Sequence, residues 1–213
     1  MEGDSAAMEA GDLNRETLFP REDTAPLDAA EDHRAEQEPG GRGGGRGHRS
    51  PGPDPEKDPE AAARAIVLRQ LTGSPKSRRQ LADKLSERGI PRDAAEGILD
   101  RFEELQLIDD AAFAEAWVRS RARSRGLSRS ALRRELREKG IADELSDEAL
   151  EQLSGADELE MARELVEKKV RSMPAGLDHD KGVRRLVAML GRKGYGSGTA
   201  FRVVNEIWTA DRD

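Results

Sequence analysis

Basic side chains concentrate between residues 119 and 139, and their type and spacing indicate a binding chemistry. This segment of 21 residues holds nine Lys or Arg and two acids, a net charge of +7. Arg129, Arg133 and Arg137 recur every four residues and therefore share one face of a helix. Such a stripe can bind phosphates or an acidic protein surface, although a solvated face with ordinary ion pairs has the same pattern. The predicted contact patch consists of Arg119, Arg121, Arg123, Arg125, Arg129, Arg133, Arg134, Arg137 and Lys139.

The sequence has no pattern that indicates catalysis or metal binding, although carboxylates are plentiful. The chain has no cysteine, which excludes disulfides and thiolate metal ligands. Two of its three histidines, His33 and His48, lie near the N-terminus. The third, His179, lies between two aspartates, where the start of a helix is a simpler explanation than a ligand cluster. The glycines of residues 191–198 lack the spacing of a phosphate-binding loop. We therefore predict no enzymatic activity, no metal site and no cofactor.

The basic segment belongs to a sequence unit that occurs three times. The motif Leu-x-x-x-Leu-x-x-[Arg/Lys]-Gly-[Ile/Tyr] has its glycines at Gly89, Gly140 and Gly194, which are 51 and 54 residues apart. Each glycine fits the position just after a helix, where a left-handed backbone is needed. Repeats of this kind mainly contact their neighbours, so the pattern favours an elongated binding surface over one catalytic pocket.

Apolar spacing predicts three helices in each repeat. Ser77 to Gln80 form a capping box that starts the second helix of the first repeat, and Asp109 caps the first helix of the second repeat. We find no alternating run typical of a strand, so we predict an all-α fold: three tandem three-helix repeats in an elongated, curved array. The predicted apolar positions include Val67, Leu71, Leu81, Leu85, Ile98, Leu99, Phe102, Leu105, Phe113, Trp117, Leu132, Leu136, Leu150, Val166, Leu186, Leu190, Tyr195, Phe201, Val204 and Trp208.

Four aromatic residues could serve either in the core or as exposed anchors: Phe113, Trp117, Tyr195 and Trp208. Phe113 and Trp117 are four residues apart and share a helix face. Core packing is the expected role of all four, because aromatic side chains bury large areas. An exposed anchor for a partner is the alternative.

The first 60 residues differ in composition from the remainder. They hold 16 acidic and 7 basic residues and seven of the ten prolines. Such a composition does not bury enough apolar surface to fold, so we predict a disordered acidic Gly/Pro-rich tail over residues 1–59. The predicted repeats then span residues 60–108, 109–156 and 157–213. The whole chain has a net charge of −7, whereas residues 61–213 have +2.

Neither a membrane span nor a secretory signal is expected. No apolar run approaches the roughly 18–20 residues of a transmembrane helix. The N-terminus is acidic and lacks an apolar signal core. Together with the absence of cysteine, these features predict a cytoplasmic protein.

The third helix of the first two repeats argues against sequence reading in DNA. Residues 92–105 have a net charge of −3, and residues 142–153 carry five acids and no base. The phosphates beside a major groove would repel such helices. Any contact with nucleic acid is therefore expected through the second helices and residues 119–125, to the backbone rather than the bases.

Two motifs of the second repeat carry a family resemblance. Residues 109–121 have the pattern Asp-Asp-x-x-Phe-Ala-x-x-Trp-Val-Arg-x-Arg, and residues 132–141 have Leu-x-x-Glu-Leu-x-x-Lys-Gly-Ile. Together they resemble the central repeat of the bacterial regulatory protein RecX. The first repeat also matches, from Arg79 to Asp110, and the third, with its motif ending at Tyr195, matches more loosely. The resemblance covers roughly residues 60–208.

The resemblance implies a modulator of the RecA recombinase. Members of this family bind RecA nucleoprotein filaments, lie along the filament groove, and generally suppress filament growth, ATP hydrolysis, strand exchange and coprotease activity. An elongated repeat protein with a basic patch is compatible with that role. We therefore expect the RecA filament as the partner, single- or double-stranded DNA as a further candidate, and a monomeric chain. The alternatives are a direct DNA-binding protein that uses the basic helical face, and a helical-repeat adaptor for another protein.

Overall fold

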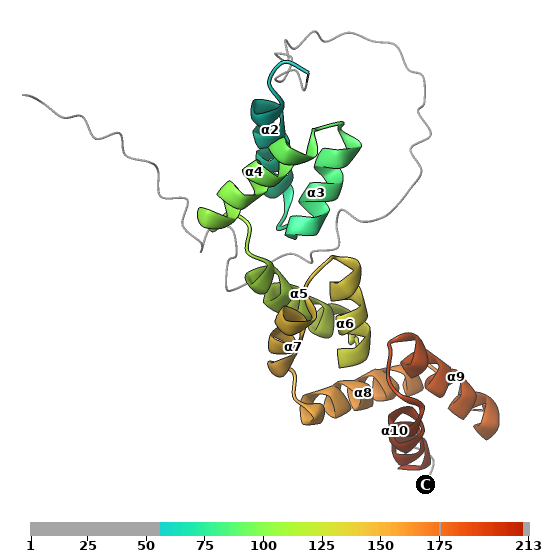
Figure 1. Ribbon diagram of the computed structural model, residues 1–213. Coiled ribbons are helices and arrows are strands. Elements are labelled where there is room, and N and C mark those ends of the chain that lie inside the picture. Colours follow the sequence, from blue (N-terminus) through green and yellow to red (C-terminus); the bar gives the residue numbers. More distant parts are fainter. Residues whose placement is uncertain (1–55, 175, 211–213) are drawn as a thin grey trace, which may run out of the picture.

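This computed structural model describes residues 56–174 and 176–210 of the chain. These residues form nine helices joined by turns and contain no strand (Figure 1). The prediction of an all-α fold is confirmed. The predicted tail falls outside the described residues, apart from its last four positions. The helices are α2 (Pro59–Gly73), α3 (Arg78–Glu87), α4 (Arg92–Glu104), α5 (Asp110–Arg125), α6 (Arg129–Glu138), α7 (Asp143–Glu151), α8 (Gly155–Val170), α9 (His179–Arg192) and α10 (Ser197–Ala210).

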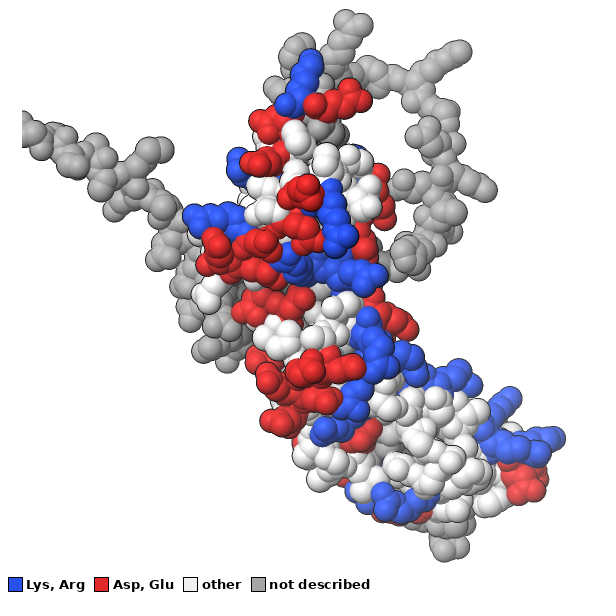
Figure 2. Space-filling model, in the orientation of Figure 1, with Lys and Arg blue, Asp and Glu red and all other residues white. Residues whose placement is uncertain are grey.

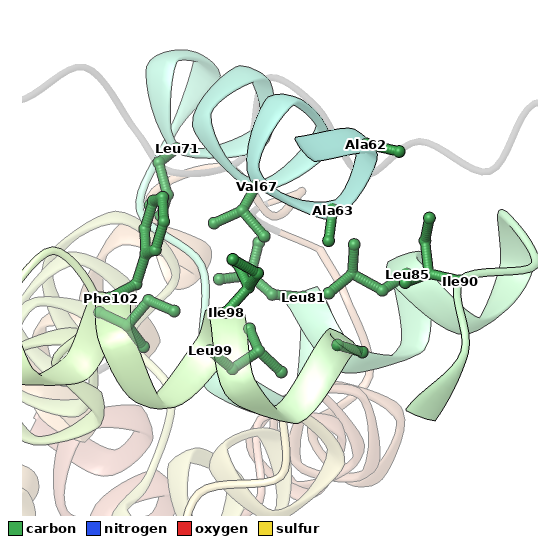
Figure 3. Packing of buried hydrophobic residues seen from close by; sticks show 12 residues of the cluster. Ala62, Ala63, Val67, Leu71, Leu81, Leu85, Ile90, Ile98, Leu99 and Phe102 are labelled. Carbon is green, nitrogen blue, oxygen red and sulfur yellow. The ribbon is translucent and has the colours of Figure 1, made fainter. Parts of the chain in front are cut away.

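Each set of three consecutive helices encloses its own hydrophobic core. We refer to α2–α4 as unit 1, α5–α7 as unit 2 and α8–α10 as unit 3; the exact repeat boundaries stay a prediction. In unit 1, Val67 of α2 packs with Leu81 of α3 and Ile98 of α4 (Figure 3). The buried residues of units 2 and 3 also form separate clusters, and Met161 of α8 packs against the core of unit 2. Figure 1 shows the units in succession, with a change of direction at unit 3, as expected for an elongated, curved array.

Local signals set the helix ends as the sequence predicts. Ser77 caps α3 through its side chain and forms a capping box with Gln80. Asp109 accepts a hydrogen bond of 2.8 Å from the N–H of Ala112 at the start of α5. The motif glycines Gly89, Gly140 and Gly194 have φ angles of 72°, 79° and 88°, the left-handed region that favours glycine. The structural part of the repeat motif is therefore confirmed.

Two predicted core positions are wrong, whereas the four aromatic predictions are confirmed. Leu105 is 51% exposed because α4 ends at Glu104 and Leu105 follows as its C-cap. Phe201 is 50% exposed because α10 directs its neighbours, among them Val204, into the core. Phe113, Trp117, Tyr195 and Trp208 are all buried.

Units 1 and 2 meet through a small polar joint. The Ser77 hydroxyl, at the start of α3, donates a hydrogen bond of 2.6 Å to the carbonyl oxygen of Lys139. The N–H of Arg78 donates one of 2.8 Å to Oδ1 of Asp110, in the first turn of α5. Burial raises the pKa of Asp110, and this hydrogen bond from Arg78 opposes the rise. The turn at Gly140 thus lies against the start of α3.

Units 2 and 3 meet through a joint of the same design. The N–H of Ser128, at the start of α6, donates a hydrogen bond of 3.0 Å to the carbonyl oxygen of Lys193. The N–H of Arg129 donates one of 2.9 Å to Oε1 of Glu158, in α8. The turn at Gly194 therefore lies against the start of α6, as the turn at Gly140 lies against the start of α3.

Candidate interaction surface

All nine residues of the predicted basic patch lie in unit 2. Four of them belong to α5, four belong to α6, and Lys139 is the C-cap of α6. The two helices pack against each other in one core, so the structure does bring these residues to one region. Their surroundings nevertheless differ and divide the patch into three groups.

The first group holds α5 and α6 together. Arg121 is 3% exposed, and its guanidinium carbon lies 4.1 Å from the centroid of the Trp117 ring. The ammonium of Lys139 lies 4.7 Å from the same centroid, and both contacts are cation–π interactions. The indole N–H of Trp117 donates a hydrogen bond of 2.9 Å to Oε2 of Glu135. Arg121 is therefore not accessible to a partner, and we remove it from the patch.

The second group pairs with acceptors of the same unit, two of which are acidic side chains. The guanidinium of Arg129 donates to the carbonyl oxygen of Leu153, and Arg133 forms an ion pair with Asp147 of α7. Nη2 of Arg137 lies 3.0 Å from Oδ1 of Asp143, which also belongs to α7. The stripe at every fourth residue therefore faces α7, which agrees with the ordinary ion-pair interpretation.

Unit 1 pairs its charges in the same way. Nη2 of Arg78, on α3, lies 2.7 Å from Oε2 of Glu96 and 2.7 Å from Oδ1 of Asp100. Nη1 of the same guanidinium pairs with Glu103, and all three acids belong to α4. The acidic third helices that the sequence shows are thus partly matched by basic residues of their own second helices. They do not form an unopposed acidic face.

The third group is exposed. Arg119, Arg123 and Arg134 are exposed, and none has an ion pair or a side-chain hydrogen bond with the described residues. Arg119 and Arg123 are four residues apart and share a face of α5. We refer to these three residues as the free arginine set. Arg125 is also exposed, but it belongs to the second joint, where its carbonyl oxygen accepts a hydrogen bond from the ammonium of Lys193.

Charges of opposite sign are separated on the face shown in Figure 2. Lys and Arg follow the side of α6 and continue onto unit 3, whereas Asp and Glu gather over α4 and α7. Much of unit 3 in this view is uncharged. A groove or filament that presents phosphates or carboxylates would meet the α5–α6 side more favourably than the α4–α7 side.

The second joint contains an open hollow of about 380 Å³. Its two arginines, Arg129 and Arg133, already have partners, and burial raises the pKa of Tyr195, which therefore stays a neutral phenol. The phenol donates a hydrogen bond of 3.2 Å to the carbonyl oxygen of Gly126. The hollow also holds Ser130, whose hydroxyl donates a hydrogen bond to the carbonyl oxygen of Gly194, and Glu158, which accepts one from the N–H of Arg129. Its lining is Arg129, Ser130, Arg133, Glu158, Gly194, Tyr195, Gly196 and Thr199.

The described residues offer neither a metal site nor a helix that could span a membrane. Within residues 56–174 and 176–210, no group of three or more His, Cys, Asp or Glu side chains could hold a metal ion. No helix in this part of the chain is long and apolar enough to cross a membrane.

Each of the three units separately matches the model of a known family domain. The model described as the first three-helix domain of RecX matches residues 63–102, and the second matches residues 109–150. The third matches residues 156–204. The chain belongs to the RecX family. The predicted family and its three three-helix domains are thereby confirmed, and RecX is a family of regulatory proteins.

Individual relatives agree with this assignment. "Regulatory protein RecX" of Streptomyces lividans is 53% identical over 150 residues, which cover 70% of this chain and 79% of that protein. The protein of the same name from Thermobifida fusca is 44% identical over 150 residues, which cover 70% of this chain and 80% of the relative.

Two solved RecX structures share the fold. The crystal structure of RecX from Lactobacillus salivarius superposes with a TM-score of 0.62, at 22% identity, over 71% of this chain and 98% of that one. A second crystal structure of a regulatory protein RecX gives a TM-score of 0.59, at 27% identity, over 70% of this chain and 72% of that one.

Sequence reasoning missed the residues that join the units. Ser77 and Ser128 are recognisable as helix caps, but nothing local shows that they also contact the next unit. The one available signal was the repeat itself, because each serine lies four residues before the first leucine of its motif. It was also not foreseeable that Arg121 would be buried against Trp117.

Proposed function

We propose that this RecX-family chain binds filaments of the RecA recombinase in the cytoplasm and suppresses their growth, ATP hydrolysis, strand exchange and coprotease activity. The observation that carries the proposal is the match of all three units, in order, to the three RecX domains. The architecture supports it, since three units in a curved row offer a long surface with few contacts between them. Such a surface suits a long helical partner better than a small ligand.

We assign the contact with the filament to the free arginine set. Arg119, Arg123 and Arg134 keep their guanidinium groups exposed to solvent, so binding would break no internal ion pair that the structure contains. Guanidinium groups form bidentate hydrogen bonds with both carboxylates and phosphates. The set is therefore suited to acidic side chains of RecA or to the DNA backbone within the filament. Arg129, Arg133 and Arg137 are expected to act mainly by stabilising unit 2.

The direct test is RecA ATP hydrolysis on single-stranded DNA with the full chain added below one molecule per RecA. Strong inhibition at this ratio is expected, because blocking or capping filament growth needs little protein, whereas competition for DNA needs more. No effect even at excess would overturn the proposal and leave the adaptor interpretation or direct DNA binding.

A triple variant tests the contact surface. Replacing Arg119, Arg123 and Arg134 together by Gln should weaken filament binding roughly tenfold or more, equivalent to at least about 1.4 kcal/mol. The matched control replaces Arg64, Arg69 and Arg185 by Gln; these residues are also exposed, lie on other helices, and change the net charge equally. Binding should be measured for both variants at one fixed salt concentration. Equal losses in the two variants would reject a specific role for the set.

Direct DNA binding is the second candidate, and one observation favours it. Phe201 is 50% exposed and precedes the exposed Arg202 on α10, a combination that can stack on bases and contact phosphates. Unlike α4 and α7, α10 has no excess of acids. Binding of DNA without RecA, with a steep salt dependence and loss on Phe201→Ala, would favour this candidate.

A further inference from the structure

The two joints between units are built from the same two halves. One half is the start of a second helix, α3 or α6, with its capping serine and the N–H of the next residue. The other half comes from the following unit: the backbone carbonyl before a motif glycine, and a carboxylate near the start of its first helix. A chain of three units uses each half twice, so one copy of each half remains at its ends.

Unit 1 contains the unused copy of the second half, which consists of the turn at Gly89 and a carboxylate at the start of α2. Gly89 has the same left-handed backbone as Gly140 and Gly194, but an added Cβ there would meet nothing within 4 Å. Arg88 is exposed, whereas Lys139 and Lys193 at the equivalent positions are half-buried. Unit 1 also has an exposed carboxylate in the first turn of α2, that of Glu60.

The half that remains in unit 3 is the start of α9. Residues 178–181 are all exposed, whereas Ser77 and Ser128, the capping residues of the occupied joints, are 0% and 1% exposed. The cap of α9 is Asp178, whose side chain accepts a hydrogen bond of 3.1 Å from the N–H of Lys181. Figure 1 shows the start of α9 and the turn between α3 and α4 at opposite ends of the array.

We propose that copies of this chain associate end to end, with the Gly89 turn of one copy placed against the start of α9 of the next. The backbone N–H of Asp178 donates to the carbonyl oxygen of Arg88, as the N–H of Ser128 donates to the carbonyl oxygen of Lys193 in the second joint. This hydrogen bond uses the backbone of the capping residue and needs no serine hydroxyl. Glu60 accepts from the N–H of His179, as Asp110 and Glu158 accept from Arg78 and Arg129.

The charge of Arg88 favours this pairing. The exposed turn carries Arg88, and the start of α9 carries Asp178 and Asp180. At the internal joints, the residue before the motif glycine is likewise basic, Lys139 or Lys193. Arg88 attracts Asp178 and Asp180, and Lys181 attracts Glu60, whereas Glu60 is repelled by the two aspartates.

The contact is heterologous, so it leaves one open half at each end of every assembly and can continue. A few hydrogen bonds without an apolar core give a weak association, which leaves the chain monomeric when dilute. Neighbouring copies on one long partner would meet at a high effective concentration, and there the contact would make binding cooperative. This last step rests on the proposed function, whereas the contact itself can be tested without RecA.

Site-directed crosslinking tests the contact, and the chain has no native cysteine to interfere. The test variant carries Arg88→Cys and Asp180→Cys and is treated, concentrated and without RecA, with a short bismaleimide. The internal control carries Lys139→Cys and Arg79→Cys, the equivalent positions in the first joint, where a Cβ on Gly140 would approach the Arg79 Cβ to 2.3 Å. A negative control combines Asp180→Cys with Arg101→Cys, an exposed position elsewhere on unit 1.

The expected result is a ladder of dimers and trimers for the test variant, an internal link within monomers for the internal control, and no ladder for the negative control. Sedimentation of the otherwise native chain should show a mass that rises with concentration, and Arg88→Glu, which replaces the attraction to Asp178 and Asp180 by repulsion, should abolish the rise. Linked monomers in the internal control without any ladder in the test variant would overturn the proposal. A ladder of equal strength in the negative control would do the same.

Discussion

Gly182 and Gly191 lie in the same helix, α9, but their surroundings are opposite. A Cβ on Gly182 would lie 2.2 Å from Cζ2 of Trp208, so the indole occupies the space that any side chain would need. A Cβ on Gly191 would meet nothing within 4 Å. Glycine weakens a helix by about 1 kcal/mol relative to alanine, and this penalty is all that the sequence can show. The packing of Trp208 accounts for Gly182 and not for Gly191.

Alanine substitutions should therefore have opposite effects at the two positions. Gly191→Ala should stabilise unit 3 by up to about 1 kcal/mol through helix propensity. Gly182→Ala should destabilise it by about 1–3 kcal/mol, because the indole must move. Urea unfolding followed by Trp208 fluorescence, in a chain that also carries Trp117→Phe, measures both. Equal changes of the same sign would show that the indole does not depend on Gly182.

The fate of the basic patch shows where residue-level prediction ends. Charge density along the sequence correctly identifies a basic region, because composition is local information. Whether a given arginine is free depends in part on partners on other helices: Arg133 pairs with Asp147 of α7, and Arg121, which lies over Trp117 of its own helix, pairs with Glu135 of α6. The same helical spacing that places Arg129, Arg133 and Arg137 on one face also places them opposite α7. Only a structure separates them from Arg119, Arg123 and Arg134.

At the scale of helices, prediction succeeded wherever a boundary has a local cause. The capping box at Ser77 and the left-handed glycines act within one turn, so their residue types determine them. The apolar spacing predicted burial less reliably at the edges of each helix face, as the exposed Leu105 and Phe201 show. Periodicity indicates which face of a helix is buried but not how wide that face is. The joints were not predicted, because they form between helices that belong to different units.

A pair of glycine variants can isolate the first joint. Gly140→Ala and Gly89→Ala both place a side chain on a left-handed backbone, and each should destabilise its own unit by about 1–2 kcal/mol. Only the added methyl group at Gly140 collides with the neighbouring unit, at Arg79. Introduced into the chain with Arg79→Cys and Lys139→Cys, Gly140→Ala should therefore lower the yield of the internal crosslink, and Gly89→Ala should leave it unchanged. Equal yields in the two variants would mean that the joint tolerates the collision.

At the scale of the whole molecule, three small cores are connected by polar contacts. The buried residues of the three cores form separate clusters, and Met161 of α8, which packs against the core of unit 2, is the apolar residue of these clusters that crosses a joint, so little apolar area is lost when neighbouring units separate. A unit of about 50 residues is marginally stable by itself. The chain should therefore behave as a weakly coupled row, in which units can adjust their angles to follow a curved partner.

Weak coupling predicts that units 2 and 3 unfold at different urea concentrations. The two tryptophans of the chain report on them separately, since Trp117 lies in the core of unit 2 and Trp208 in that of unit 3. In a chain with Trp117→Phe, fluorescence follows unit 3; with Trp208→Phe, it follows unit 2.

Each substitution weakens only the unit that is no longer observed, provided that the coupling is weak. We expect the lower midpoint for unit 3, because α9 carries Gly191, whose helix penalty no packing contact explains. Coincident midpoints in both variants and in the circular dichroism of the native chain would instead show one cooperative body. In that case the joints would be stronger than their hydrogen bonds suggest, and the array would meet its partner with a fixed curvature.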